Sequence, residues 1–452
     1  MPHQVHSTDI AMSNSPNPQD SLNVWHSLRS TDAETPPPEE VQEGFFNGAL
    51  VQPLTRVCPS EAPLVAVIGV GYVGEHLVTT FSSKFNVLAF DVSKQRLESL
   101  AKVLTSPSIT LTSNASDLAA ATHFLVSVPT TLLPNKQVDT SHIRAALATV
   151  STYARPGATV VIESSVAVGM TRKLLQKLMI SRQLKAGMSP ERVDPGRIEP
   201  PVSSIPKIIS GLDDITPDSL SSIQSLYSRV FDRVVPVSSP EVAEMTKLYE
   251  NCQRMICIAY VNEMSDACEA HGISPFEVAS AASTKPFGYL PFTPSLGVGG
   301  HCIPVNPYYL LTNNEFPLLQ DAAERMWARP GKVADKAIRT LFARRGNEGV
   351  SKAWPEVLVV GVGFKPGQSV LSCSPGVAMM KHILQQWDVK VTFADPLVAE
   401  TAVPFAPKLD EKDWTLQGLR KFDLIIVAIR QTGLDFGVLE ELDDVQVKWC
   451  CA

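Results

Sequence analysis

The sequence predicts an α/β fold with two Rossmann-like, doubly wound domains joined by a long central helix and a helical middle domain. Short apolar runs alternate with helical patterns in two parts of the chain, which is typical of βαβ units in a parallel sheet. Each part opens with an apolar run that ends in glycines, at residues 64–74 and 357–363. Between them, residues 240–271 form the longest uninterrupted helical pattern, with apolar residues near helical spacing.

The first part begins with Leu64–Ile68, a continuous apolar run of the kind expected for a strand buried on both faces. Further strands are expected at residues 87–90, 124–128 and 159–162. Helices are expected between them, at residues 93–104 and 141–154.

The second part opens with a strand at residue 357. Ser374 followed by Pro375 is a strong helix start, because serine caps the helix and proline suits its first position. Strands are then expected at residues 389–393 and 424–428, and the last few residues show little sign of a closing element.

Composition restricts the class of protein. The chain has 452 residues, 44% of them hydrophobic, and a net charge of −7, so it suits a globular protein without a general attraction for nucleic acid. No apolar run reaches the length of a membrane span, and the eight cysteines show neither CxxC pairs nor metal-ligand spacing. We expect a soluble, cytoplasmic protein that binds no metal. Residues 1–61 are rich in polar residues and proline, which predicts a disordered tail without a secretory signal.

Glycines at 69, 71 and 74 form a GxGxxG motif between an expected strand and an expected helix. In that setting the glycines permit a tight turn, close approach of a pyrophosphate and close helix–strand packing. Asp91 follows the second strand, where an acid binds the ribose 2′-hydroxyl and repels a 2′-phosphate. The motif therefore predicts NAD rather than NADP. The alternative is a turn that binds nothing, with Asp91 as a surface turn residue.

Glycines also crowd the residues before Cys302, and prolines follow it at 304 and 307. A helix that begins near Pro304 or Pro307 would favour the thiolate and make Cys302 a nucleophile. The alternative is a buried packing cysteine. That alternative is preferred for four cysteines in or beside patterned elements, which are Cys252, Cys257, Cys268 and Cys373.

From about residue 64 to 430 the chain resembles the UDP-glucose/GDP-mannose dehydrogenase family. The segment GGHCIPV followed by NPYYLL is most similar to the UDP-N-acetylmannosamine branch. Other family-like stretches are 127–130 (SVPT), 163–165 (ESS), 189–193 (SPERV), 205–207 (IPK) with Gly211, and 246–251 (TKLYEN).

The resemblance implies a nucleotide-sugar 6-dehydrogenase in polysaccharide precursor synthesis. Such an enzyme oxidises a UDP-hexose or UDP-N-acetylhexosamine C6 alcohol to the uronate, a four-electron oxidation that uses two NAD. Cys302 would form a thiohemiacetal and then a thioester, so that one nucleophile couples two oxidations. The resemblance also implies a homodimer or larger homo-oligomer packed through the central helix.

Individual residues receive roles from this resemblance. Lys247 and Asn251 are four residues apart, so on a helix they share a face and donate together to a developing oxyanion. Glu191 is expected to be the general base for thioester hydrolysis. Thr130 and Glu163 follow expected strands, where doubly wound sheets bind ligands. The alternatives are a solvated lysine, a packing asparagine, a surface turn acid and strand-end caps.

The motifs and the resemblance together give three sets of expected site residues. The catalytic set is Cys302, Lys247, Asn251, Glu191, Thr130 and Asn306. The cofactor set is Gly69, Gly71, Tyr72, Val73, Gly74, Asp91, Arg96, Pro129, Thr130, Glu163 and Lys365. The substrate set is Glu191, Arg192, Val193, Lys247, Asn251, Gly299 and Gly300. The expected domains are an NAD-binding domain over 62–236, a central helical dimerisation and catalytic domain over 237–335, and a UDP-binding Rossmann-like domain over 352–452.

Four departures from the family pattern affect substrate and rate. Asn306 stands where an aspartate is usual and cannot take up a proton. An arginine that holds the nucleotide sugar is replaced near Phe287, and residues 365–375 keep a lysine and Ser-Pro but lack the usual acids and arginine. Ser165 and Ala167 stand where threonine and proline are usual.

These departures leave a second hypothesis, a catalytically weakened relative that binds NAD or a nucleotide sugar as a regulatory subunit. Retention of the other expected catalytic residues favours an active enzyme. A third hypothesis, a two-electron hydroxyacid dehydrogenase, leaves the cysteine loop unexplained.

Overall fold

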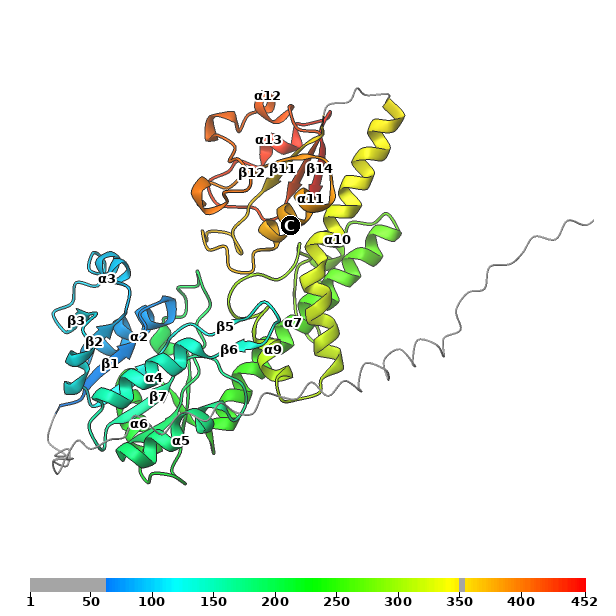
Figure 1. The fold of residues 1–452 in the computed structure, drawn as a ribbon. Helices are drawn as coiled ribbons and strands as arrows, with labels where there is room; N and C mark the ends of the chain where they lie inside the picture. The colour runs from blue at the N-terminus through cyan, green and yellow to red at the C-terminus, as the bar shows by residue number, and fades with distance from the viewer. Residues whose placement is uncertain (1–61, 349–353) are drawn as a thin grey trace, which may run out of the picture. The chain divides into compact units, whose positions relative to one another are not determined.

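The computed structural model describes residues 62–348 and 354–452 (Figure 1). The expected disordered tail over 1–61 lies outside these residues. The α/β class with a parallel-dominated sheet and a helical middle region is confirmed. In the described parts of the chain, no helix is both long and apolar enough to cross a membrane.

The first sheet has eight strands in the order β10-β9-β8-β7-β4-β1-β2-β3. All neighbouring pairs are parallel except β8 and β9, which are antiparallel. The strands are β1 (Leu64–Ile68), β2 (Asn86–Phe90), β3 (Ile109–Thr112), β4 (His123–Val126), β7 (Thr159–Ile162), β8 (Lys185–Met188), β9 (Lys207–Gly211) and β10 (Val234–Pro236).

Apolar side chains fill both faces of this sheet, which explains why its strands read as continuous apolar runs. Helices α4 (Ser141–Tyr153) and α5 (Met170–Arg182) cover one face. The other face is covered by α2 (Tyr72–Ser82), α3 (Lys94–Leu100) and α6 (Ser219–Tyr227).

A helical region follows the sheet. It consists of α7 (Pro240–Ala270), α8 (Pro275–Ser283), α9 (Asn306–Leu311) and α10 (Pro317–Glu348), and a small hairpin of β5 (Thr131–Leu132) and β6 (Val138–Asp139) contributes to its core. The expected long helix over 240–271 is confirmed as α7, but it is not the longest, because α10 has 32 residues against 31. Pro330 lies inside α10 and interrupts its sequence pattern.

The second sheet has four parallel strands in the order β12-β11-β13-β14. They are β11 (Glu356–Val360), β12 (Lys390–Ala394), β13 (Leu424–Val427) and β14 (Gln446–Trp449). The view that the chain lacks a closing element is wrong, because β14 pairs with β13. β14 gives no apolar run in the sequence, because it alternates polar and apolar residues and all four are half-buried at the sheet edge.

Helices cover both faces of this second sheet as well. Helices α10 and α11 (Pro375–Gln386) pack on one face, and α12 (Leu416–Leu419) and α13 (Gly437–Glu440) pack on the other. Ser374 caps α11, since its hydroxyl accepts a hydrogen bond of 3.2 Å from the Val377 amide, as the sequence predicted.

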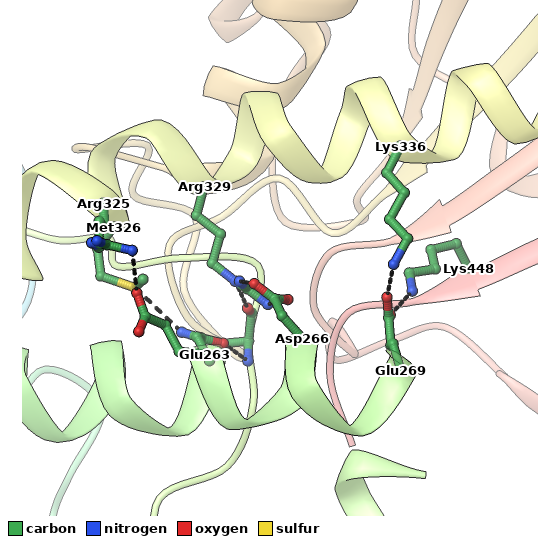
Figure 2. A network of polar contacts seen from close by, with 10 residues as sticks. Glu263, Asp266, Glu269, Arg325, Met326, Arg329, Lys336 and Lys448 are labelled. Atoms are coloured by element: carbon green, nitrogen blue, oxygen red, sulfur yellow. Dashed lines mark hydrogen bonds and ion pairs between the residues drawn. The ribbon is translucent and has the colours of Figure 1, made fainter. Parts of the chain in front are cut away.

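Ion pairs join α7 to α10 and to β14 (Figure 2). Arg325 pairs with Glu263 at 2.9 Å, and Arg329 forms a bidentate pair with Asp266. Further along α7, Glu269 accepts from both Lys336 and Lys448. The acids are spaced three residues apart, so they face α10 on successive turns. This row of ion pairs links the second sheet to α7.

A buried carboxylate ties α7 to the first sheet's helices. Glu244 is 1% exposed and accepts hydrogen bonds from the amides of Gly169 (2.6 Å) and Thr171 (2.8 Å) at the start of α5. The cap residue Gly169 has no side chain to do this. Glu244 therefore serves as a capping group supplied from a distant helix.

Replacing Glu244 with alanine is expected to lower the free energy of unfolding by about 1–3 kcal/mol, because two buried amides lose their acceptor. Urea unfolding measures the change. Glu263→Ala is the matched control on the same helix, and loss of its exposed ion pair should cost no more than about 1 kcal/mol. Equal destabilisation by the two variants would contradict this role of Glu244.

Candidate active site

A cavity of about 270 Å³ lies where the glycine loop, the ends of β4 and β7, α7 and the cysteine loop meet. Its lining contains most of the expected site residues, namely Gly71, Tyr72, Val73, Pro129, Thr130, Glu163, Glu191, Val193, Lys247, Cys302 and Asn306. A larger cavity of about 540 Å³ lies over the ion pairs between α7 and α10, and it contains neither the glycine loop nor Cys302.

The glycine loop has the geometry that a dinucleotide needs. Gly69 has φ +85°, and a Cβ at Gly74 would lie 2.1 Å from the Gly69 carbonyl oxygen, so helix and strand pack too closely for a side chain. A Cβ at Gly71 would meet nothing within 4 Å. The space above the start of α2 is therefore open, and the 11-residue helix directs free amides toward it.

This loop lies at the point where the strand order of the first sheet reverses, between β1 and β4. Doubly wound sheets bind their ligands there. A second cavity of about 170 Å³ at this point is lined by Gly69, Asp91 and Pro129. The residues present thus fit NAD, since the start of α2 would hold the pyrophosphate and Asp91 would hold the ribose.

Asp91 and Arg96 support the loop itself. The Asp91 carboxylate accepts from the amides of Val70 and Ser93, both at 2.9 Å. The Arg96 guanidinium donates to the Val70 carbonyl at 2.8 Å and pairs with Glu75 at 2.7 Å. Both side chains therefore fix the backbone that borders the cofactor cavity.

Two glycine variants separate cofactor binding from folding. Gly71→Ala is expected to preserve the unfolding free energy but to weaken NAD binding at least about tenfold, because its methyl group enters the open space. Gly74→Ala should instead destabilise the protein, because its Cβ meets backbone. Calorimetric titration with NAD and thermal melts measure both effects. Unchanged NAD affinity in Gly71→Ala would contradict this placement.

Cys302 is half-buried and lines the cavity instead of packing in an apolar core. Its carbonyl accepts from the Asn306 amide at 2.9 Å, where α9 begins, close to the helix start that the prolines predicted. Gly300 has φ +90° and donates to the Ser372 carbonyl at 2.8 Å. A Cβ at Gly299 would lie 2.8 Å from the Phe364 Cβ. These two glycines therefore let the 364–372 segment pack against the cysteine loop.

Lys247 and Asn251 share the buried face of α7, at 8% and 5% exposure. The Asn251 amide donates to the Asn306 side-chain oxygen at 2.5 Å. Across residues 62–348 and 354–452, the Lys247 ammonium makes no hydrogen bond or ion pair, although it lines the cavity. Burial lowers the pKa of Lys247, and the nearby Cys302 and Glu191 oppose this shift. A buried cation without a partner is suited to stabilise negative charge on a ligand.

Glu191 and Glu163 share a buried cation, Lys207. The Lys207 ammonium lies 3.0 Å from Glu191 Oε2 and 2.7 Å from Glu163 Oε2. Glu191 Oε1 accepts from the amides of the next two residues, at 2.5 and 2.9 Å. The Tyr227 hydroxyl donates to Glu163 Oε1. Both carboxylates line the cavity, and each is held in place by several hydrogen bonds.

Two expected ligand residues have other partners. The Arg192 guanidinium pairs with Glu250 and donates to the Pro206 carbonyl at 2.9 Å. The Lys365 ammonium lies 3.2 Å from an Asp194 oxygen and donates to the Pro195 carbonyl at 3.0 Å. Neither lines the cavity that contains Cys302.

Sequence reasoning gave no role to several residues that line or support the cavity. Lys207 supports both carboxylates, and His301, Phe364 and Gln368 line the cavity. His301 precedes the expected nucleophile Cys302, and Phe364 precedes Lys365. These neighbouring site residues could have indicated both. Lys207 appeared in the family-like segment 205–207, but nothing in the sequence placed it near Glu191.

Comparison with known proteins identifies the family. Residues 64–231 match the NAD binding domain of the UDP-glucose/GDP-mannose dehydrogenase family, and residues 241–324 match its central domain. The UDP-N-acetyl-D-glucosamine 6-dehydrogenase of Pseudomonas aeruginosa is 32% identical over 360 residues, which span 74% of this chain and 83% of that protein. The UDP-N-acetyl-D-mannosamine dehydrogenase of Pyrococcus horikoshii is 28% identical over 362 residues, spanning 75% and 84%.

Solved structures share the fold. A UDP-D-ManNAc dehydrogenase from Pyrococcus horikoshii superposes with a TM-score of 0.71 at 24% identity, covering 86% of this chain and 99% of that one. A UDP-glucose dehydrogenase from Pyrobaculum islandicum gives 0.73 at 20% identity, covering 89% and 96%. The chain therefore belongs to the UDP-glucose/GDP-mannose dehydrogenase family of NAD-dependent oxidoreductases.

Proposed function

We propose that the chain oxidises the C6 alcohol of a UDP-hexose or UDP-N-acetylhexosamine to the carboxylate, with Cys302 as covalent nucleophile. The observation that carries the proposal is the cavity that Cys302 shares with Lys247, whose buried ammonium has no partner among the described residues. The open space over Gly71 borders the same cavity. A nucleophile, an oxyanion donor and a dinucleotide loop thus meet in one place.

NAD, when bound, accepts a hydride from C6 in each of two oxidations, so two NAD are reduced per sugar. After the first oxidation, in which the hydroxyl proton goes to solvent, the Cys302 thiolate attacks the aldehyde carbon and forms a C–S bond. Lys247 and Asn251 donate to the resulting oxyanion. In the second oxidation the oxyanion becomes a carbonyl, which leaves a thioester on Cys302.

Hydrolysis then frees the enzyme. Glu191 takes a proton from water as the water oxygen bonds to C6, and the C–S bond breaks with Cys302 leaving as thiolate. Glu191 Oε2 retains acceptor capacity beside its bond to Lys207, so it can receive that proton. Asn306 cannot take up a proton, so Glu191 carries this step. The overall reaction consumes one water and releases a carboxylate.

The relatives support a class of substrate, and the surface supports an assembly. Relatives named for UDP-N-acetylhexosamines support a substrate of that class, made for polysaccharide precursors. We assign NAD binding to residues 62–236, catalysis and dimerisation to 237–335, and UDP binding to 352–452. Exposed apolar side chains on α7, among them Val242 and Tyr249, support a homodimer packed through this helix.

The test is a panel of UDP-glucose, UDP-N-acetylglucosamine and UDP-N-acetylmannosamine with NAD, with NADH counted per sugar consumed. Two NADH per sugar and a uronate product are expected from at least one member. Absence of turnover across the panel, with NAD binding retained, would instead support a regulatory binding protein.

A further inference from the structure

Lys207 is 3% exposed and is the cation shared by two buried carboxylates of the active-site cavity. Burying charges costs several kcal/mol per ion, and apolar replacements of buried ion pairs are often as stable or more stable. Packing alone therefore does not explain a lysine here. Besides the two carboxylates, its ammonium contacts the Pro190 carbonyl at 3.5 Å, directly before Glu191.

The antiparallel pairing of β9 with β8 brings Lys207 to this place. Met188 pairs with Ser210, so the start of β9 extends past the carboxyl end of β8 toward Glu191. Glu163 lies one residue beyond the end of β7, the neighbouring strand. The ammonium thus bridges the ends of two strands that border the cavity.

We propose that Lys207 is a positioning residue for the hydrolysis step, in which it keeps Glu191 ionised and holds its Oε2 beside the cavity, while Glu163, which accepts a hydrogen bond from Tyr227, holds the ammonium. The inference rests on the proposed function, where Glu191 takes the proton of the attacking water. Lys207 itself need not touch substrate.

The charges around Glu191 decide the direction of the effect. The titratable groups that interact with it are Tyr72 on α2, Glu163 just after β7, Lys207 on β9, Tyr227 on α6 and Lys247 on α7. Burial alone would raise the pKa of Glu191, but Lys207, the adjacent amide and Lys247 outweigh it, and the pKa lies below its usual range. Burial raises the pKa of Glu163 to about 6 despite Lys207.

Loss of the Lys207 charge should move the acidic limb of the pH–rate profile to higher pH. Lys207→Met leaves two buried carboxylates without their cation, so the pKa of Glu191 rises. The midpoint of the limb should move up by at least about one pH unit, a tenfold change in ionisation. Glu163→Gln is the control, because Glu163, with a pKa of about 6, is already protonated at the pH where Glu191 takes up its proton, so the limb should move far less than in Lys207→Met.

The experiment measures steady-state pH profiles and the pre-steady-state release of NADH, using the UDP-N-acetylhexosamine that the native chain oxidises. At a pH between the native and the shifted midpoint, Lys207→Met should release a burst of two NADH per site and then turn over slowly, because its Glu191 is largely protonated and the thioester accumulates. Lys207→Arg keeps the charge and should restore turnover in part. If Lys207→Met does not fold, as judged by circular dichroism, Lys207→Gln, which keeps a hydrogen-bond donor but no charge, tests the same shift.

A limb that stays in place in a folded variant without the Lys207 charge, or a loss that is equal at all pH values, would overturn the positioning role while leaving the proposed function intact. Failure of the proposed function looks different. In that case the native chain does not give two NADH per sugar, or Cys302→Ala forms as much uronate as the native chain, and the inference falls with it.

Discussion

Replacing Cys302 with alanine is expected to abolish uronate formation, with a loss on the order of 10⁴ or more in turnover, as for removal of other covalent nucleophiles. Without the sulfur no thiohemiacetal forms, so the second oxidation loses its substrate. The first oxidation does not require the C–S bond, and at most one NADH per sugar should appear, with free aldehyde. Chromatography of the sugar product and NADH absorbance give both quantities.

NAD affinity and thermal stability should be unchanged in this variant, because Cys302 is half-buried and makes no side-chain hydrogen bond in the described residues. Cys257→Ala is the matched control. Cys257 is a half-buried cysteine on α7 outside the cavity, and its loss should leave turnover at the native level. Two NADH per sugar from Cys302→Ala would disprove covalent catalysis.

Lys247→Met should lower turnover by about 10²–10³, the usual effect of removing one oxyanion donor. The variant should lower kcat more than it raises KM, because the negative charge on the sugar oxygen develops only during the reaction. Since burial lowers the pKa of Lys247, the native rate should also fall on the alkaline side at a lower pH than an ordinary lysine would give. Steady-state kinetics across pH provide the comparison.

The exposed Lys177 on α5 provides a matched Lys→Met control, because it lies outside the cavity and should change neither constant. Methionine fills a volume similar to that of the lysine stem, so the buried packing should hold. A Lys247→Met variant with native kcat would remove the oxyanion role from this residue and leave Asn251 as the donor.

Much of the fold was predictable because the spacing of apolar residues and the positions of the glycines indicate the same elements. Apolar runs such as Leu64–Ile68 mark buried parallel strands, and the GxGxxG motif between strand and helix places the dinucleotide loop. The elements that were not predicted have partly polar or interrupted patterns. β14 has only half-buried residues, and Pro330 breaks the pattern of α10 without ending the helix.

Many residues that line the candidate cavity were predictable, but their partners were less so. Spacing placed Lys247 and Asn251 on one helix face, and the structure puts them on the buried side of α7. The link from Lys207 to Glu191 depends on an antiparallel pairing within a sheet that is otherwise parallel. Strand direction at one pair of strands leaves no local signal in the sequence, so this contact could not be predicted.

The central claim is that one sulfur carries the sugar carbon through both oxidations. Rapid acid quench of Glu191→Gln with substrate and NAD, followed by peptide mass spectrometry, tests it directly, since loss of the base should trap the thioester. The account predicts a sugar acyl adduct on the Cys302 peptide together with two NADH per site. An unmodified Cys302 peptide at a time when two NADH per site have been released would contradict it.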